Sequence, residues 1–213
     1  AGTGQWQYYN GSTWVNIGAA STAAAVTIAA SAPIRFLPAT DFNGPAPTLT
    51  VKLVDASGGA LTNGAVVNTT TSGGSTPYST STVVLSHAVT AVNDAPTVTG
   101  GSAVSLTSIG EDSAPGAGQT VSSLFASHFS DAKDQVSGGS SADAFTGVAV
   151  TANAATAAQG VYQYFDGVTW QDLPAVSTAA AFVLDASTLV RFVAAADYSG
   201  TAPALTVSMI EDS

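Results

Sequence analysis

Residues 4–17, GQWQYYNGSTWVNI, resemble residues 160–173, GVYQYFDGVTWQDL. The likeness extends to both sides without a gap, so that residues 1–57 align with residues 157–213 at an offset of 156. Roughly 25 of these 57 positions are identical. The chain therefore holds one full period of an internal repeat and part of a second. We expect tandem modules of a longer array, in which each module contacts only its neighbours.

Alternation of apolar and polar residues marks β-strands within the period. Apolar side chains fall on every second residue at Leu49–Leu53, Val83–Leu85, Val148–Val150 and Leu205–Met209. Turn-forming pairs such as Asn10-Gly11 separate the strands. Short strands at this spacing predict an all-β fold of tandem immunoglobulin-like β-sandwich domains.

The domain boundary is predicted at Val92-Asn93-Asp94-Ala95-Pro96-Thr97. A strand-like run ends there, and proline ends ladder pairing. This boundary gives one β-sandwich domain at residues 1–94 and a second at residues 95–213. Helical periodicity is confined to Leu124–Phe129, which predicts a single turn of helix.

Charge and composition restrict the partners of the chain. Fourteen acidic and four basic residues give a net charge of −10 at pH 7, which disfavours binding to nucleic acid or to anionic membranes and favours a cation. The chain has no cysteine, so disulfides and thiolate metal sites are excluded. Apolar stretches such as Ala23–Ala32 are shorter than the roughly 20 residues that cross a bilayer, so we expect no membrane insertion. Any export signal is expected outside this sequence, since residues 1–4 lack signal-peptide features.

Catalytic groups do not form a recognisable constellation in the sequence. The only two histidines, His87 and His128, are isolated. A nucleophile elbow and a phosphate-binding loop are both absent from the sequence. We expect no enzymatic activity.

Aromatic residues gather in the repeated stretch and allow two interpretations. In the first, they form a surface on which sugars stack. In the second, Trp6 and Tyr8 share one strand face, and the hairpin at Asn10-Gly11 places the rings in the core. The alternation favours the second interpretation, which predicts that Trp14→Ala and Trp170→Ala each cost about 3–5 kcal/mol.

An arginine recurs at the same place in both copies. Arg35 and Arg191 each precede an aspartate by six positions, at Asp41 and Asp197. We expect each arginine to tether a loop by pairing with that aspartate.

Acidic residues gather in turns and at strand ends. They are Asp41, Asp55, Asp94, Glu111, Asp112, Asp131, Asp134, Asp143, Asp197, Glu211 and Asp212. Calcium takes about six to eight oxygen ligands, which such loops supply well. The alternative is ordinary solvated charge, which we expect above all for Asp143, Asp166 and Asp172.

Short motifs in this sequence resemble those of cadherins and bacterial cadherin-like repeats. Val92-Asn93-Asp94-Ala95-Pro96 resembles the linker whose Asn and Asp bind calcium between modules. Ile109-Gly110-Glu111-Asp112 and Ser130-Asp131-Ala132-Lys133-Asp134 resemble the early acidic motifs of those repeats. Asp41-Phe42-Asn43-Gly44 and Leu53-Val54-Asp55-Ala56-Ser57-Gly58 resemble the late ones. The whole chain is similar to the extender repeats of RTX-type giant adhesins.

This resemblance implies a fold, a function and a set of ligands. The fold is a series of cadherin-like sandwiches in a secreted protein of the bacterial cell surface. The function is that of a structural extender, or spacer, which projects a distal binding domain in adhesion and biofilm formation. Calcium ions rigidify the junctions between neighbouring repeats of the same chain. The implied ligands are Asp41, Asp55, Asn93, Asp94, Glu111, Asp112, Asp131 and Asp134, whereas Asp143 is expected to take no part.

The alternative function is that of a carbohydrate- or peptide-binding adhesin module. An exposed aromatic platform beside acidic loops would favour this alternative. Rings buried in both copies of the repeat would favour the spacer.

Overall fold

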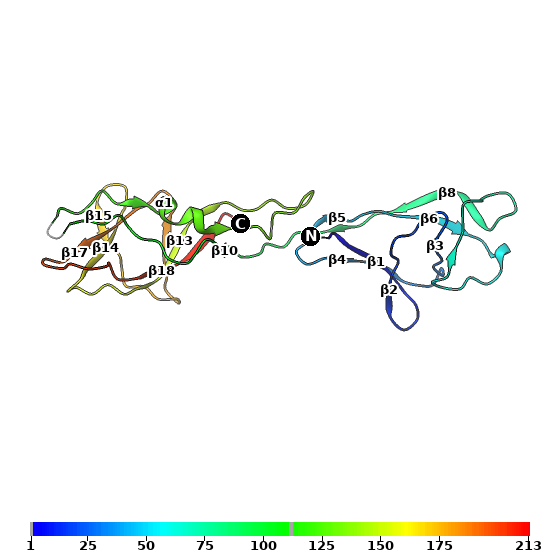
Figure 1. The fold of residues 1–213 in the computed structure, drawn as a ribbon, viewed down its shortest axis with the longest axis horizontal. Coiled ribbons are helices and arrows are strands. Elements are labelled where there is room, and N and C mark those ends of the chain that lie inside the picture. The colour runs from blue at the N-terminus through cyan, green and yellow to red at the C-terminus, as the bar shows by residue number, and fades with distance from the viewer. Residues whose placement is uncertain (1, 111–112) are drawn as a thin grey trace. The chain divides into compact units, whose positions relative to one another are not determined.

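The computed structural model describes residues 2–110 and 113–213 and shows an all-β protein (Figure 1). The all-β prediction is therefore confirmed. The strands belong to two compact units. The first unit contains residues 2–92 and 134–141, and the second contains the other described residues from 93 to 213. The units divide between Val92 and Asn93, two residues before the expected boundary.

The first unit is built from short strands. They are β1 (Gly4–Tyr9), β2 (Trp14–Asn16), β3 (Ala25–Val26), β4 (Ile34–Pro38), β5 (Gly44–Pro45), β6 (Leu49–Val54), β7 (Val66–Val67), β8 (Tyr78–Leu85) and β9 (Ala88–Val89), with the 3-10 turn η1 (Ala56–Gly58). All pair antiparallel, in the sheets β2-β1-β4, β3-β7, β5-β9 and β6-β8. The segment 134–141 joins this unit, where Asn43 and Ser140 exchange two hydrogen bonds of 2.6 and 2.8 Å.

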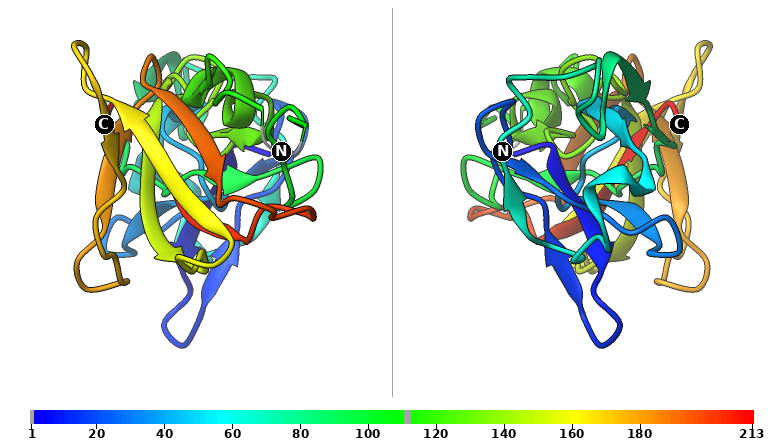
Figure 2. Two further views of the ribbon diagram at one scale, coloured as in Figure 1. Left: turned by 90° about the vertical axis from the view of Figure 1, so that its left-hand side faces the viewer. Right: turned by 90° about the vertical axis from the view of Figure 1, so that its right-hand side faces the viewer.

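The second unit has longer strands and one short helix. Its elements are β10 (Thr97–Val98), β11 (Gln119–Thr120), α1 (Val121–Phe125), the 3-10 turn η2 (Ala126–His128), β12 (Phe129–Ser130), β13 (Phe145–Asn153), β14 (Gly160–Phe165), β15 (Trp170–Asp172), β16 (Phe182–Asp185), β17 (Leu189–Ala194) and β18 (Leu205–Glu211). They form the antiparallel sheets β11-β17-β14-β15, β16-β13-β18 and β10-β12. The left view of Figure 2 shows β14 and β17 as neighbouring strands.

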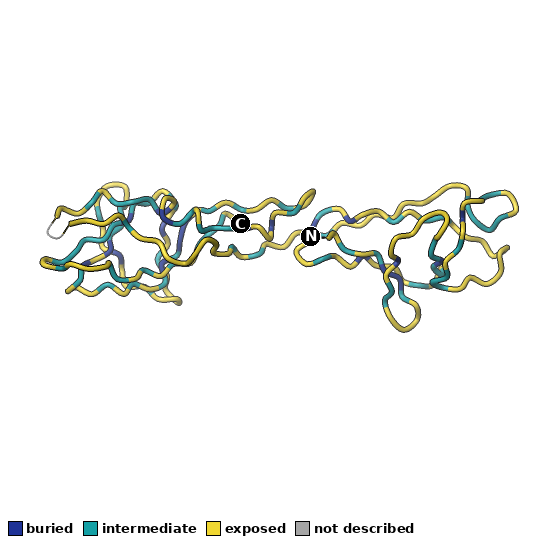
Figure 3. Tube along the Cα trace, viewed as in Figure 1, coloured by how far each residue is buried: buried dark blue, intermediate teal, exposed yellow. Residues whose placement is uncertain are grey.

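Two sheets of the second unit bury one core between them. Val148 and Val150 of β13 and Leu184 of β16 meet Tyr162 of β14 and Val190 of β17. Val121 of α1 and Leu173 complete the cluster, and the dark segments of Figure 3 mark its place. Sheets that contact through such a shared core form a sandwich-like arrangement.

The α-helix begins slightly earlier than the sequence predicts. Thr120 caps it, because the Thr120 hydroxyl accepts a hydrogen bond of 3.1 Å from the backbone N–H of Ser123. Val121 then turns into the core. In the described part of the chain, no helix is long and apolar enough to cross a membrane.

The hairpin that opens each copy of the repeat is closed by a side chain. Asn10 Oδ1 accepts hydrogen bonds from the N–H groups of Ser12 and Thr13, both at 2.9 Å. Asp166 does the same for Val168 and Thr169, at 2.8 and 2.7 Å. The backbone N–H of Thr169, followed by that of Val168, lowers the pKa of Asp166. Asn and Asp close turns in this way, and the glycine that follows supplies the positive φ.

Both copies of the repeat fold alike within their own units. After the offset of 156 is applied, the bounds of β1, β2, β4 and β6 match those of β14, β15, β17 and β18 to within one residue. An aromatic side chain near the start of each first strand donates a hydrogen bond to a proline carbonyl 41 residues on, from Trp6 to Pro47 at 2.6 Å and from Tyr162 to Pro203 at 2.7 Å. Burial raises the pKa of the Tyr162 hydroxyl.

Candidate metal site

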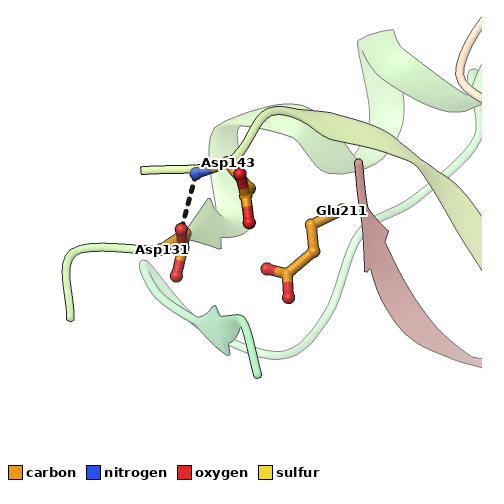
Figure 4. Close-up of side chains that lie close together, drawn as sticks. All are labelled: Asp131, Asp143 and Glu211. Carbon is orange, nitrogen blue, oxygen red and sulfur yellow. Dashed lines mark hydrogen bonds between the residues drawn. The ribbon is translucent and has the colours of Figure 1, made fainter. Parts of the chain in front are cut away.

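Three carboxylates of the second unit converge at one end of its strands. Asp131 directly follows β12, Asp143 precedes β13, and Glu211 is the last residue of β18. Each offers an oxygen, and these oxygens lie within 4.8 Å of one another (Figure 4). We call Asp131, Asp143 and Glu211 the carboxylate cluster.

Strand pairing brings the members of the carboxylate cluster together. Phe145, two residues after Asp143, is the register partner of Glu211 across the β13–β18 ladder. The backbone N–H of Asp143 donates a 2.6 Å hydrogen bond to Asp131 Oδ2. This bond fixes the loop after β12 against the start of β13.

Burial makes the carboxylate cluster unusual. Asp131 is only 5% exposed. Within the described part of the chain, Asp131 Oδ1 and Glu211 Oε2 are buried and have no hydrogen-bond partner. An unpaired buried polar atom costs roughly 1–3 kcal/mol, and more when it is charged. Neighbouring carboxylates also repel one another, so a bound cation would relieve both costs.

The polar groups around the cluster orient it. Asn93 Nδ2 donates a 2.9 Å hydrogen bond to Glu211 Oε1. The backbone N–H of Ala144 binds Asp212 Oδ1 at 2.6 Å. Lys133 pairs with Asp94, with 3.6 Å between Nζ and Oδ1. Lys133 therefore neutralises a carboxylate next to Asn93 in the sequence rather than one in the cluster.

The carboxylate oxygens of the cluster would suit a hard cation. Carboxylate oxygens bind Ca²⁺, Mg²⁺ and Mn²⁺ in preference to soft metals. The two buried oxygens without a hydrogen-bond partner, Asp131 Oδ1 and Glu211 Oε2, could serve as ligands of such a cation. The remaining calcium ligands would come from the third carboxylate, backbone carbonyls and water.

The residues expected as ligands divide between the two units. Asp131 is a member of the carboxylate cluster, and Asn93 lies beside it through its bond to Glu211. Asp94 belongs to the same unit as Asp131, whereas Asp134 is buried in the first unit.

Two other expected ligands, Asp41 and Asp55, belong to the first unit and are not members of the carboxylate cluster. Asp41 is exposed in the first unit, where it adopts a φ of +59°. Asp55 caps η1 in the same unit, and its hydrogen bonds from the Ser57 side chain and then from the Ser57 backbone lower its pKa. Glu111 and Asp112 lie outside the described residues.

Sequence reasoning missed two members of the cluster. Asp143 was expected to be an ordinary solvated charge, but it is half-buried against Asp131 and Glu211. Glu211 was counted among the acidic residues at strand ends but was not chosen as a ligand. A usable signal was present, since Glu211 aligns with the candidate Asp55 at the offset of 156. An acidic residue therefore recurs at this position in both copies.

The repeated tryptophans are covered by arginine. The guanidinium carbon of Arg35 lies 4.1 Å from the ring centre of Trp14, and that of Arg191 lies 3.9 Å from the ring centre of Trp170. Both tryptophans are half-buried. The fold thus uses each pair as a stacked contact at the edge of a sheet.

The expected pairing of arginine with aspartate was wrong. Arg35 Nε donates instead to Gln7 Oε1 at 2.8 Å, and Arg191 Nε donates to Gln163 Oε1 at 2.9 Å. Gln7 and Gln163 are the cross-strand partners of these arginines. A glutamine on the adjacent strand therefore accepts the hydrogen bond of each arginine, whereas Asp41 and Asp197 are exposed in turns.

This arrangement changes the expectation for Trp170→Ala. The ring is half-buried and contacts Phe165, with 5.5 Å between ring centres, and Arg191. We expect a loss of about 2 kcal/mol in the free energy of unfolding, from partial burial and one cation–π contact, instead of 3–5 kcal/mol. Urea unfolding followed by circular dichroism measures this loss. A loss above about 4 kcal/mol would show that the ring acts as a core residue.

No protein-family model, no curated protein and no solved structure matches the chain.

Proposed function

We propose that this chain is a structural extender, or spacer, of a secreted bacterial cell-surface adhesin. Its tandem units are immunoglobulin-like, cadherin-like β-sandwiches, and calcium at the junctions between repeats rigidifies them. The region projects a distal binding domain in adhesion and biofilm formation. Its partners are neighbouring repeats of the same chain and calcium ions.

The observation that carries this proposal is the partly buried carboxylate cluster in a repeated all-β chain. Asp131 and Glu211 hold buried oxygens without a partner in the described residues. Asn93, from the linker motif, contacts the same Glu211. A hard cation bound there would neutralise the cluster and tie the linker to β13 and β18.

Other features support a mechanical rather than a catalytic role. His128 Nδ1 lies 3.1 and 3.0 Å from the carbonyl oxygens of Thr99 and Gly101, so it serves a loop. His87 contacts the ring of Phe36, with 6.4 Å between ring centres. The two histidines belong to different units. We propose no enzymatic activity and no binding to nucleic acid.

Calcium titration by calorimetry tests the metal site. Extracellular calcium modules bind with dissociation constants of about 10⁻⁴–10⁻³ M, and we expect this range. A hundredfold excess over the dissociation constant should stabilise the folded chain by about 2.7 kcal/mol, which thermal unfolding will show as a higher Tm.

The matched variants are Asp131→Asn and Asp197→Asn. Each removes one carboxylate, but Asp197 is exposed and lies outside the cluster. Asp131→Asn should weaken calcium binding at least about tenfold, which is 1.4 kcal/mol. In chelator it should be no less stable than the parent, since it relieves repulsion. Equal calcium affinity in both variants would refute the site.

Small-angle scattering tests the spacer role separately. Calcium should increase the maximum dimension of the chain relative to chelator, because a bound ion restrains the linker next to Asn93. The sandwiches should stay folded by circular dichroism in both conditions. An unchanged dimension, together with clear calcium binding, would leave a metal site but would remove the stiffening role.

The alternative function, a carbohydrate- or peptide-binding module, would need an open aromatic platform. Arginine lies over one face of Trp14 and of Trp170. This cover weighs against sugar stacking and favours the spacer.

A further inference from the structure

Two strands of the first unit each leave one edge open. β3 pairs only with β7, and β6 pairs only with β8, within the described part of the chain. An open edge presents unpaired N–H and C=O groups to any strand that can pair with it. The second unit shows what covers the corresponding edges.

In the second unit one central strand joins the two corresponding segments. β13 lies between β16 and β18. Val148 is opposite Leu184 on one side and Met209 on the other. After the offset of 156, these two partners correspond to Ile28 and Leu53 in the first unit. The first unit thus contains both neighbours of a β13-type strand.

The open edge of β6 is the edge that β13 covers on β18. The N–H groups of Leu53 and Asp55 point toward the β8 side. Leu53 donates to Ser79 Oγ in β8, and Asp55 donates to the carbonyl of Pro77, the residue before β8. Successive backbone groups alternate in direction along a strand, so Val54 faces the other edge.

The second unit confirms the direction for the corresponding residues of β18. The carbonyls of Thr206 and Ile210 accept hydrogen bonds from the hydroxyls of Thr151 and Thr146 in β13. Thr206 and Ile210 correspond to Thr50 and Val54. The even-numbered residues of both strands therefore face the β13 position.

The open edge of β3 points to the same occupant. The N–H of Thr27 donates to Ala65, and its carbonyl accepts from Gly64, so Thr27 faces the β7 side. Val26 and Ile28 alternate with Thr27 and face the opposite edge. In the second unit, Ala186 N–H donates to the carbonyl of Thr146 at the start of β13. The copy of Ala186 is Ala30, which is an even-numbered residue like Val26 and Ile28 and therefore faces the same edge.

Two apolar side chains of the first unit are more exposed than their copies in the second unit, as expected if a strand is missing from the first unit. Leu53 is 62% exposed, whereas its copy Met209 is partly buried. Ile34 is 39% exposed, whereas its copy Val190 is 3% exposed in the core. Among the described residues, no side chain of the first unit is as fully buried as Val148 of β13.

We propose that the first unit binds a β13-type strand between β3 and β6, supplied by the same polypeptide ahead of residue 1. The strand is extended, with small apolar side chains at alternate positions, as in Phe145–Asn153. It completes one antiparallel sheet in the order β7, β3, inserted strand, β6, β8. This inference does not depend on calcium or on the spacer function.

The connection in the second unit favours supply from the same polypeptide. β13 ends at Asn153 and β14 begins at Gly160, so a short loop joins them. Gly4, the copy of Gly160, begins β1. A β13-type strand placed ahead of β1 as β13 is placed ahead of β14 therefore needs only the same short loop. Such a short connection gives the strand a high effective concentration at its binding site.

The test adds a copy of residues 142–156 directly in front of Ala1 of the full chain. Amide hydrogen exchange, resolved by residue, is then compared with that of the unextended chain. Exchange should slow at least about a hundredfold at the amides of Val26, Ile28, Thr50, Lys52 and Val54, because a paired amide exchanges only when its sheet opens. Amides of β14 and β17 in the second unit should exchange at unchanged rates.

A matched control and a separate peptide make this test decisive. The control carries Val148→Asn and Val150→Asn in the added copy only, which keeps the length but removes the apolar face. It should give little protection. Unchanged exchange in the extended chain, or equal protection from the control, would overturn the proposal. Protection by the free peptide of residues 142–156 but not by the extension would overturn supply from the same polypeptide.

Discussion

Val150→Asp is expected to unfold the second unit. Val150 is 0% exposed at the centre of β13, opposite Phe182 of β16 and Val207 of β18. A carboxylate there would lose its hydration without gaining a partner, and the core would lose a packed side chain. We expect a loss of at least about 5 kcal/mol, against a total stability of about 5–15 kcal/mol for a typical domain. The measurement is the loss of dispersed amide resonances of the second unit in a two-dimensional NMR spectrum.

The matched control is Val183→Asp on the neighbouring strand. Val183 also lies in a ladder with β13, opposite Ala149, but its side chain is 58% exposed. The same substitution there should cost less than about 1 kcal/mol, since the carboxylate stays in water. If both variants lost the same stability, ladder pairing rather than core burial would explain the effect.

Gly160→Ala should cost about 4 kcal/mol. Gly160 has a φ of +138°, which L-residues rarely adopt. An added Cβ would lie 2.2 Å from the carbonyl oxygen of Val193 and 2.9 Å from the Cα of Ala194. These atoms belong to the backbone of the paired strand β17, so they cannot move without breaking the ladder. Backbone strain and overpacking each cost about 1–3 kcal/mol, and urea unfolding measures their sum.

Gly167→Ala separates the two causes of this loss. Gly167 also has a positive φ, at +97°, but an added Cβ would meet no atom within 4 Å. Only the conformational cost remains there, about 1–2 kcal/mol. Equal losses at Gly160 and Gly167 would show that the contact with β17 is unimportant.

Gly4→Ala extends the same comparison to the first unit. Its Cβ would lie 2.4 Å from the carbonyl oxygen of Leu37, and its φ is +126°. We expect a loss similar to that of Gly160→Ala, because the two glycines are copies of each other in the repeat.

Local features of the fold were predictable from the sequence. Period-two alternation indicated β6, β8, β13 and β18, because side chains on a strand alternate between two faces. The turns at Asn10-Gly11 and Asp166-Gly167 were equally readable, since the side chain that closes each turn is two or three residues from its partners. The repeat alone predicted that the strands of residues 1–57 recur at residues 157–213.

The carboxylate cluster was only partly predictable. Asp131 and Asn93 were chosen through a resemblance to linker and loop motifs, and both lie at the cluster. Asp143 was not chosen, because no local pattern distinguishes it from a solvated acid. Glu211 was not chosen either, although its copy in the repeat, Asp55, was.

Long-range strand pairing decided the rest. Glu211 approaches Asp131 and Asp143 because β18 pairs with β13 in one register, and a one-residue shift would turn side chains to the other face. In the same way, cross-strand pairing placed Arg191 beside Gln163 rather than Asp197. These residues are far apart in the chain, so their contacts depend on the assembled sheet and on burial, which local sequence patterns do not specify.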